Sequence, residues 1–141
     1  MAKPKKSRST GLDNCPCTGR YMEKFIQPAV LSLISKEPLH GYLIVQRLRQ
    51  MPMFEAHAPD AAGVYRLLKV MQKRGLIVGA WDLSQSGAAK KQLRITGLGR
   101  ECLRRWVVTL RAYHGQLGAM LKDIARFPRR SSSRAACCSQ R

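Results

Sequence analysis

The chain has 141 residues, with 26 Lys and Arg against 8 Asp and Glu, so its formal net charge is +18. Apolar residues make up 45% of the chain, which is ordinary for a globular protein and excludes a fully disordered polycation. The apolar runs are far shorter than the roughly 20 residues that cross a bilayer. We therefore expect a cytoplasmic protein with one small folded domain, accessory segments and no membrane segment.

The positive charge is spread over the whole chain. Both ends are basic and lack an apolar period, which predicts a flexible arm over residues 1–20 and a disordered tail over residues 128–141. More than half of the excess charge belongs to residues 21–126, so the folded surface is expected to be basic too. Such a surface attracts polyanions and favours nucleic acid as the partner. An anionic membrane surface is the competing partner, but it usually requires a basic amphipathic helix with bulky apolar residues opposite.

Two helices are expected at the start of the folded part. Apolar residues recur over residues 22–34 at the spacing of an amphipathic helix. Pro28 has no N–H, so this helix either begins close to Gln27 or bends at the proline. A second helix is expected over residues 40–50, followed by a loop over residues 51–59. His40, in the turn before this helix, is expected to be a cap or turn residue rather than a ligand or base.

The third helix has clear boundary signals. Asp60 is a good N-cap residue, because its carboxylate can accept hydrogen bonds from the free N–H groups of the first turn. Gly75 follows a cationic pair and is typical of the position just past a helix end. The stripe expected to be buried in this helix consists of Val64, Leu67, Leu68 and Met71.

Two strands are expected next. Residues 76–81 are rich in β-formers, and residues 92–96 alternate polar with apolar side chains. The segment between them carries Ser and Gly, which predicts a hairpin with Lys90 and Lys91 on its returning strand. Three helices followed by a basic hairpin is the order of a winged helix-turn-helix. We expect this domain to occupy residues 21–96.

A long helix is predicted over residues 97–127, after Thr96 as its N-cap. Apolar residues alternate there at spacings of three and four for more than three heptads, which gives roughly 40 Å of helix at 1.5 Å per residue. Such a helix overhangs a small domain, so we expect a homodimer built on it, with a helix folded back on its own domain as the alternative. The residues expected in the dimer interface are Leu103, Trp106, Leu110, Tyr113, Leu117, Met120 and Ile124, with Phe127 continuing the pattern.

Several separated motifs, in this order, resemble the PadR-like family of winged helix-turn-helix transcriptional regulators. They are Pro38-Leu39-His40-Gly41-Tyr42, then Gly63-Val64-Tyr65-Arg66-Leu67-Leu68-Lys69, then Arg74-Gly75-Leu76-Ile77, and Lys90-Lys91-Gln92-Leu93-Arg94-Ile95-Thr96 with Gly99. The resemblance covers about residues 25–110 and implies operator binding by the winged domain and a homodimer made by the C-terminal helix. The chain departs from the family at Gln92-Leu93, where an aromatic pair is usual, and at Ala62-Gly63-Val64, where Gly-Thr-Leu is common.

The fold class expected from this reading is mainly α, with three helices plus a β-hairpin wing and then a long C-terminal dimerisation helix. The third helix is the candidate reading element, because a major groove meets the N-terminal residues of such a helix. Small Ala62 and Gly63 allow close approach, Arg66 can pair bidentately with guanine, and Tyr65 and Lys69 are assigned to phosphates. Lys73 is either a further DNA contact or a solvated side chain, and Lys90 and Lys91 are assigned to the wing contact.

Cysteine usage leaves one further site open. Five cysteines, an odd number, argue against a structural disulfide framework in a cytoplasmic chain. Cys15 and Cys17 lie in the basic arm, where Arg20 favours the thiolate. A metal or redox signal at this pair is the alternative to inert thiols, and no other cofactor is expected.

The leading hypothesis for function is a sequence-specific repressor that binds a double-stranded DNA operator as a homodimer. An unidentified signal, with a small-molecule effector as one candidate, releases it from the operator. Trp106, Tyr113, Met120 and Phe127 either line a pocket for such an effector or are dimer core, which heptad spacing favours. The alternative function is a nonspecific nucleic-acid-binding protein of the nucleoid or RNA-binding type. An enzyme is not expected, because the chain has no P-loop, nucleophile elbow, H-E-x-x-H motif or convergent carboxylate pair.

Overall fold

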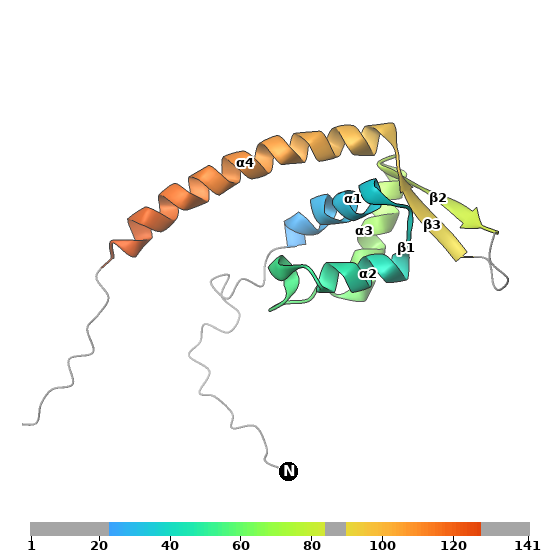
Figure 1. Ribbon diagram of the computed structural model, residues 1–141, viewed down its shortest axis with the longest axis horizontal. Helices are drawn as coiled ribbons and strands as arrows, with labels where there is room; N and C mark the ends of the chain where they lie inside the picture. Colours follow the sequence, from blue (N-terminus) through green and yellow to red (C-terminus); the bar gives the residue numbers. More distant parts are fainter. Residues whose placement is uncertain (1–22, 84–89, 128–141) are drawn as a thin grey trace, which may run out of the picture. The chain divides into compact units, whose positions relative to one another are not determined.

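The computed structural model describes residues 23–83 and 90–127. Along the chain it has the helices η2 (Glu23–Phe25), α1 (Ile26–Lys36), α2 (Gly41–Arg49), η3 (Pro52–Phe54), α3 (Ala61–Lys73) and α4 (Gly97–Ala125), and the strands β1 (Leu39–His40), β2 (Ile77–Asp82) and β3 (Lys90–Ile95) (Figure 1). The expected mainly helical fold with three helices, a wing and a long last helix is confirmed. The chain forms two compact units, Met1–Trp106 and Val107–Arg141.

Helix α1 begins where the proline permits. Pro28 lies in its first turn, a position whose N–H has no partner inside the helix, so the missing donor is tolerated. Of the two expectations for this segment, the start close to Gln27 is confirmed, and a short 3-10 turn precedes it. Helix α2 buries Ile44, Val45 and Leu48, the three residues that form its inward stripe.

Helix α3 has both of its predicted boundaries. The Asp60 carboxylate accepts a hydrogen bond from the Gly63 N–H at 3.0 Å. Gly75 has a φ of 72°, the left-handed conformation that glycine adopts most readily after a helix end. Val64, Leu68 and Met71 are buried, while Leu67 is half-buried against the core. Local sequence therefore fixes the length of the helix and the face that it turns outward.

The wing belongs to a three-stranded antiparallel sheet with the strand order β1-β3-β2. Strand β1 pairs Leu39 with Leu93 and His40 with Gln92, and β2 pairs with β3 along its whole length. The sequence predicted only the hairpin. Strand β1 was missed because two residues give no alternating pattern of their own, and β3 begins two residues before the expected start.

One hydrophobic core holds this unit together. It contains fifteen buried apolar residues: Val30, Leu31, Leu33, Ile34, Leu39, Ile44, Val45, Leu48, Phe54, Val64, Leu68, Met71, Leu76, Ile77 and Leu93. Phe54 comes from η3, inside the segment expected to be an irregular loop. Its burial explains why that connection folds back onto the domain.

The start of α4 packs on the backbone between α3 and β2. The Thr96 N–H donates to the Leu76 carbonyl at 3.1 Å. The Thr96 hydroxyl lies 2.6 Å from the Gly75 carbonyl and accepts from the Gly99 N–H at 3.0 Å. Thr96 is thus the N-cap that the sequence predicts. A Cβ on buried Gly99 would collide with the Leu76 carbonyl oxygen, so only glycine fits there.

Residues 107–125 continue α4 as one helix, which ends at Ala125, two residues before the expected end. Val108, Leu117, Leu121 and Ile124 are among its exposed apolar side chains. In the described part of the chain, no helix is both long enough and apolar enough to span a bilayer.

We predict that Gly99→Ala lowers the free energy of unfolding by about 1–3 kcal/mol, because the added methyl overpacks the contact with Leu76. Gly97→Ala is the matched control, since a Cβ at residue 97 meets nothing within 4 Å. This control should leave stability unchanged or raise it by up to about 1 kcal/mol. Urea denaturation measures both. Equal stability of the two variants would contradict the assigned contact.

Candidate nucleic-acid interface

The outward face of α3 carries a stripe of cations. Arg66, Lys69 and Lys73 follow Ala62 at spacings of four, three and four, which places all of them on one side of the helix. All four are exposed, Gly63 is half-buried, and no acidic residue lies within the helix itself. The structure therefore brings the predicted reading residues together on one surface.

The tip of α3 holds a carboxylate as well as a cation. The Asp60 Oδ2 that caps the helix lies 3.9 Å from a guanidinium nitrogen of Arg66. Both side chains are about three-quarters exposed, at 75% for Arg66 and 73% for Asp60, so the pair is weak and water-screened. Arg66 is held near the helix start and remains free to exchange this partner for another acceptor.

Tyr65 stands where α3 meets α2. A Cβ on Gly41, the first residue of α2, would lie 2.7 Å from the Tyr65 Cε1 atom, so the ring packs directly on the glycine. The side chain is nevertheless 43% exposed and is not part of the core. This close packing fixes the direction of the ring while leaving one part of it accessible.

The two wing lysines lie on different faces of the hairpin. Successive side chains of a strand alternate between faces, and Lys91 pairs with Trp81 while Lys90 pairs with Asp82. Lys91 therefore shares the face of buried Leu93, whereas Lys90 shares the opposite face with Arg94. The sequence assigned the two lysines together, because it does not specify which face of the hairpin meets the domain.

His40 lies at the start of α2, but its side chain bonds the wing. It occupies the N-cap position of α2, but its side chain makes no capping hydrogen bond. Its Nδ1 lies 3.2 Å from the carbonyl oxygen of Lys91 instead. The expected position at the helix start is thus confirmed, but the ring bonds the wing backbone instead of the helix N–H groups, because β1 pairs with β3.

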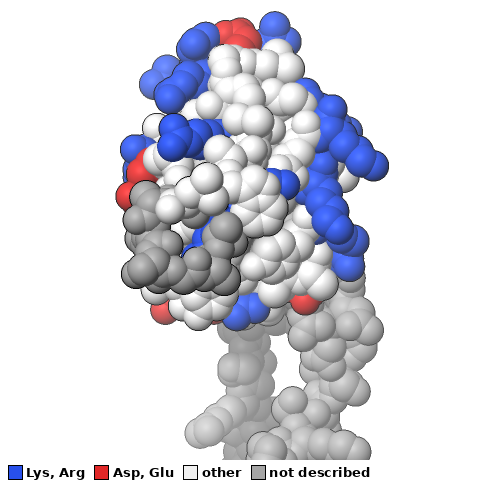
Figure 2. All heavy atoms as spheres, turned by 90° about the vertical axis from the view of Figure 1, so that its right-hand side faces the viewer, with Lys and Arg blue, Asp and Glu red and all other residues white. Residues whose placement is uncertain are grey.

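Basic residues border the face from which the wing projects. Figure 2 shows Lys and Arg side chains along both margins of this face, uncharged side chains between them and few acidic ones. Arg94, exposed on β3, is a cation that the sequence reasoning did not select. Because side chains alternate between the faces of a strand, the apolar Leu93 next to it could have indicated that Arg94 is exposed. The surface suits a long polyanion better than a small anionic ligand.

A family model described as the transcriptional regulator PadR-like family matches residues 30–105. This chain belongs to that family. The expected resemblance to the PadR-like family is confirmed, and the family is one of transcriptional regulators, not of enzymes. The comparison with curated proteins found no match.

Solved structures share the PadR-like fold. A PadR family transcription regulator from hypervirulent Clostridium difficile R20291 is 21% identical, with a TM-score of 0.61, and the match covers 69% of this chain and 98% of that chain. A PadR-like transcriptional regulator from Bacillus cereus is 24% identical, with a TM-score of 0.58, and covers 75% and 96% of the two chains. A PadR family transcriptional regulator from Eggerthella lenta is 25% identical, with a TM-score of 0.58, and covers 70% and 82%.

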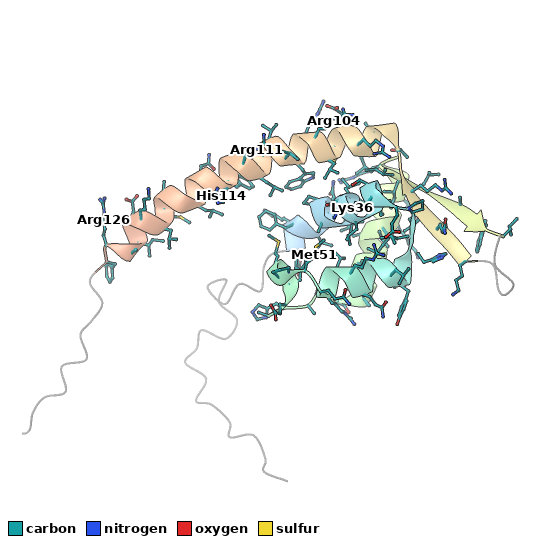
Figure 3. The ribbon with its side chains drawn as sticks, viewed as in Figure 1. Lys36, Met51, Arg104, Arg111, His114 and Arg126 are labelled. Carbon is teal, nitrogen blue, oxygen red and sulfur yellow. The ribbon has the colours of Figure 1, made fainter. Side chains whose placement is uncertain are left out.

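The predicted dimer residues of this PadR-like regulator fall into two groups. Leu103 and Trp106 are half-buried and pack against the core of their own unit. Leu110 is half-buried. The other four predicted residues are 45–61% exposed: Tyr113, Leu117, Met120 and Ile124. Side chains project all along this part of α4 (Figure 3), where Arg111 and His114 are labelled, with Arg126 just past the helix end. The exposed group supplies the apolar surface that the dimer prediction requires.

The cysteine hypothesis lies outside the described residues, since Cys15 and Cys17 precede residue 23. Within residues 23–83 and 90–127, no group of three or more His, Cys, Asp or Glu side chains could hold a metal ion. Cys102 is half-buried, with its sulfur 3.6 Å from the Gln27 Nε2 atom.

We predict that Gly41→Ala lowers DNA affinity by about tenfold with little effect on stability, because the new methyl displaces the half-exposed Tyr65 ring. The same substitution in a Tyr65→Ala background has no ring to displace and should cause no further loss. Fluorescence anisotropy with a labelled duplex measures all four proteins of this double-mutant cycle. An equal loss in both backgrounds would show that Gly41 acts independently of Tyr65.

Proposed function

We propose that this PadR-like regulator is a cytoplasmic, sequence-specific repressor that binds its operator as a homodimer and is released by a signal. The observation that carries the proposal is the stripe of Arg66, Lys69 and Lys73 on α3, a helix whose first turn is lined by small residues. Family membership implies DNA binding, and this stripe supplies both phosphate contacts and a group able to read bases.

Each residue of α3 has a distinct role in this proposal. Ala62 and Gly63 allow the first turn to approach base edges closely. Arg66 reaches the O6 and N7 atoms of a guanine, the commonest bidentate contact in the major groove. Tyr65, Lys69 and Lys73 hold phosphates and set the register of the helix on the duplex. Lys90 and Lys91 add phosphate contacts from the wing.

Asp60 refines this assignment. Its carboxylate accepts from the Gly63 N–H and places a negative charge at the start of α3, so this helix end is a poor phosphate site. Arg66 exchanges the weak contact with Asp60 for a guanine, which presents two acceptors in a fixed geometry. Because Arg66 must leave Asp60 to bind DNA, it gains less binding free energy from an arbitrary phosphate than from the two matched acceptors of a guanine. The neighbouring carboxylate therefore favours specific over nonspecific binding.

Dimer formation follows from the apolar side chains of residues 107–125. Tyr113, Leu117, Met120 and Ile124 repeat at heptad spacing, and a second copy of the same stripe would bury them. Two reading helices would then enter successive major grooves, about 34–36 Å apart, on a two-fold symmetric operator. A releasing signal acts by binding one dimer geometry more tightly than the other, because equal affinity for both shifts nothing.

A nonspecific nucleic-acid-binding protein is the second candidate, favoured by the net charge of +18. It uses the same cations without reading bases. Selection of bound duplexes from a random library separates the two functions. A repressor enriches a symmetric sequence with a high specificity ratio, whereas equal affinity for random duplexes identifies the nonspecific protein.

We predict different effects for two substitutions on one face of α3. Arg66→Ala should weaken binding to the selected site by about 1–3 kcal/mol and relax the preference at one base position. Lys69→Ala should weaken binding to all duplexes alike and reduce the slope of log affinity against log salt by about one. Titrations at several salt concentrations measure both. Unchanged base preference in Arg66→Ala would remove its assignment to guanine.

We predict that Leu117→Glu converts the dimer to a monomer and lowers operator affinity at least tenfold, because a carboxylate would be buried in the apolar stripe. Gln116→Glu is the matched control, since it adds the same charge at an exposed position outside the stripe. Sedimentation equilibrium gives the oligomeric state. A wild-type protein that is monomeric at working concentrations and still selects its operator would overturn the dimer.

A further inference from the structure

The wing exposes a tryptophan that none of the roles above uses. Trp81 is 65% exposed on β2, close to the end of the strand, and Leu83 just beyond it is 82% exposed. Trp106, the other of the two tryptophans in the chain, packs against the core. An indole is large and mainly apolar with one polar N–H, a combination that is enriched at binding surfaces.

The strand register places Trp81 beside a cation. Trp81 is directly opposite Lys91, and side chains at directly opposed positions of an antiparallel pair share a face. A Cβ on Gly79 would collide with the Lys91 Cε atom, so the lysine stem lies across the glycine on this same face. Trp81 and Lys91 therefore form one combined apolar and cationic surface, hereafter the Trp81 face.

The Trp81 face is continuous with the reading helix. The Gln72 Nε2 atom of α3 and the Lys91 Nζ atom both lie 3.1 Å from the same Cβ position at Gly79. Trp81 is two residues further along the strand, about 7 Å away at 3.3–3.4 Å per residue. Gln72 is one turn beyond Lys69, so the strand face that carries Trp81 is the one that meets the C-terminal half of α3.

The opposite face of the hairpin differs in its content. Val78 is 51% exposed there, and its partner across the strands is Arg94, with Lys90 nearer the tip. Cations thus lie on both faces, but only the Trp81 face adjoins α3. This asymmetry identifies the side of the wing that approaches a duplex when α3 enters its major groove.

We propose that the Trp81 face binds the sugar–phosphate backbone of duplex DNA bordering the groove that α3 enters. The indole packs against a deoxyribose, and the Lys91 ammonium pairs with an adjacent phosphate. The inference rests on the proposed DNA-binding function and adds a contact residue to it. Charge complementarity favours DNA over a protein partner, because an apolar ring beside the Lys91 ammonium suits a partner that joins apolar sugars to regularly spaced anions.

Tryptophan emission tests the contact directly. In Trp106→Phe the only tryptophan is Trp81, and we expect a random-sequence 20-base-pair duplex to quench or shift its emission in step with binding measured by anisotropy. In Trp81→Phe the remaining emission comes from Trp106 and should stay unchanged on binding; this variant also serves if Trp106→Phe does not fold. Duplex binding without any change in Trp81 emission overturns the inference and leaves the proposed function standing. Absence of binding both to this duplex and to any duplex enriched from the random library overturns the inference and the proposed function together.

Affinity measurements provide the second test. Trp81→Ala should lower duplex affinity about tenfold, the scale expected for losing roughly 50–60 Å² of apolar contact, and Trp81→Phe should retain most of the affinity. Val78→Ala is the matched control on the opposite face and should change affinity less than about twofold. Equal losses from Trp81→Ala and Val78→Ala would overturn the assignment of the face.

Lysine substitutions complete the design. Lys91→Ala and Trp81→Ala should be non-additive, because both alter the same contact, whereas Lys90→Ala and Trp81→Ala should be additive. Sedimentation of Trp81→Ala tests the competing partner, a second copy of the chain. A change in oligomeric state with unaltered duplex affinity would identify the Trp81 face as a protein contact and overturn the proposal.

Discussion

The junction around Thr96 joins the end of α3, the two wing strands and the start of α4. The hydroxyl and the N–H of Thr96 donate hydrogen bonds to the backbone that joins α3 to β2, and the same hydroxyl caps α4. Gly99 then sets α4 directly against the Leu76 carbonyl. The end of the reading helix and both wing strands meet within these few residues, so the direction of the wing relative to α3 depends on backbone contacts that only a small set of side chains permits.

Most of the fold could be predicted from local chemistry. Asp60 caps the start of α3, and Gly75 adopts the left-handed conformation after its end. Both effects act within a few residues, so the bounds of α3 could be predicted from the sequence. Strand β1 could not be read, because it exists only through its pairing with Leu93, more than fifty residues away. Phe54 was missed for the same reason, since its burial comes from the tertiary core.

The candidate site was likewise predictable only where it depends on local sequence spacing. Spacing alone placed Arg66, Lys69 and Lys73 on one face, because helical periodicity is local. The division between Lys90 and Lys91 required the register of the wing and the identity of the strand face that meets the domain. Trp81 carries no charge, so a search for cations passed over it. The distinction between a core aromatic and an exposed one depends on how far β2 extends past the core.

The three residues Leu39, His40 and Gly41 link the wing to α3. Leu39 and His40 are joined to the wing through the sheet and the Lys91 carbonyl, and Gly41 supports the ring of Tyr65 on α3. A displacement of this tripeptide would move the wing and the tyrosine in concert. The spacing between α3 and the wing is therefore set by backbone contacts, whereas the exposed side chains on both elements can be exchanged without altering it.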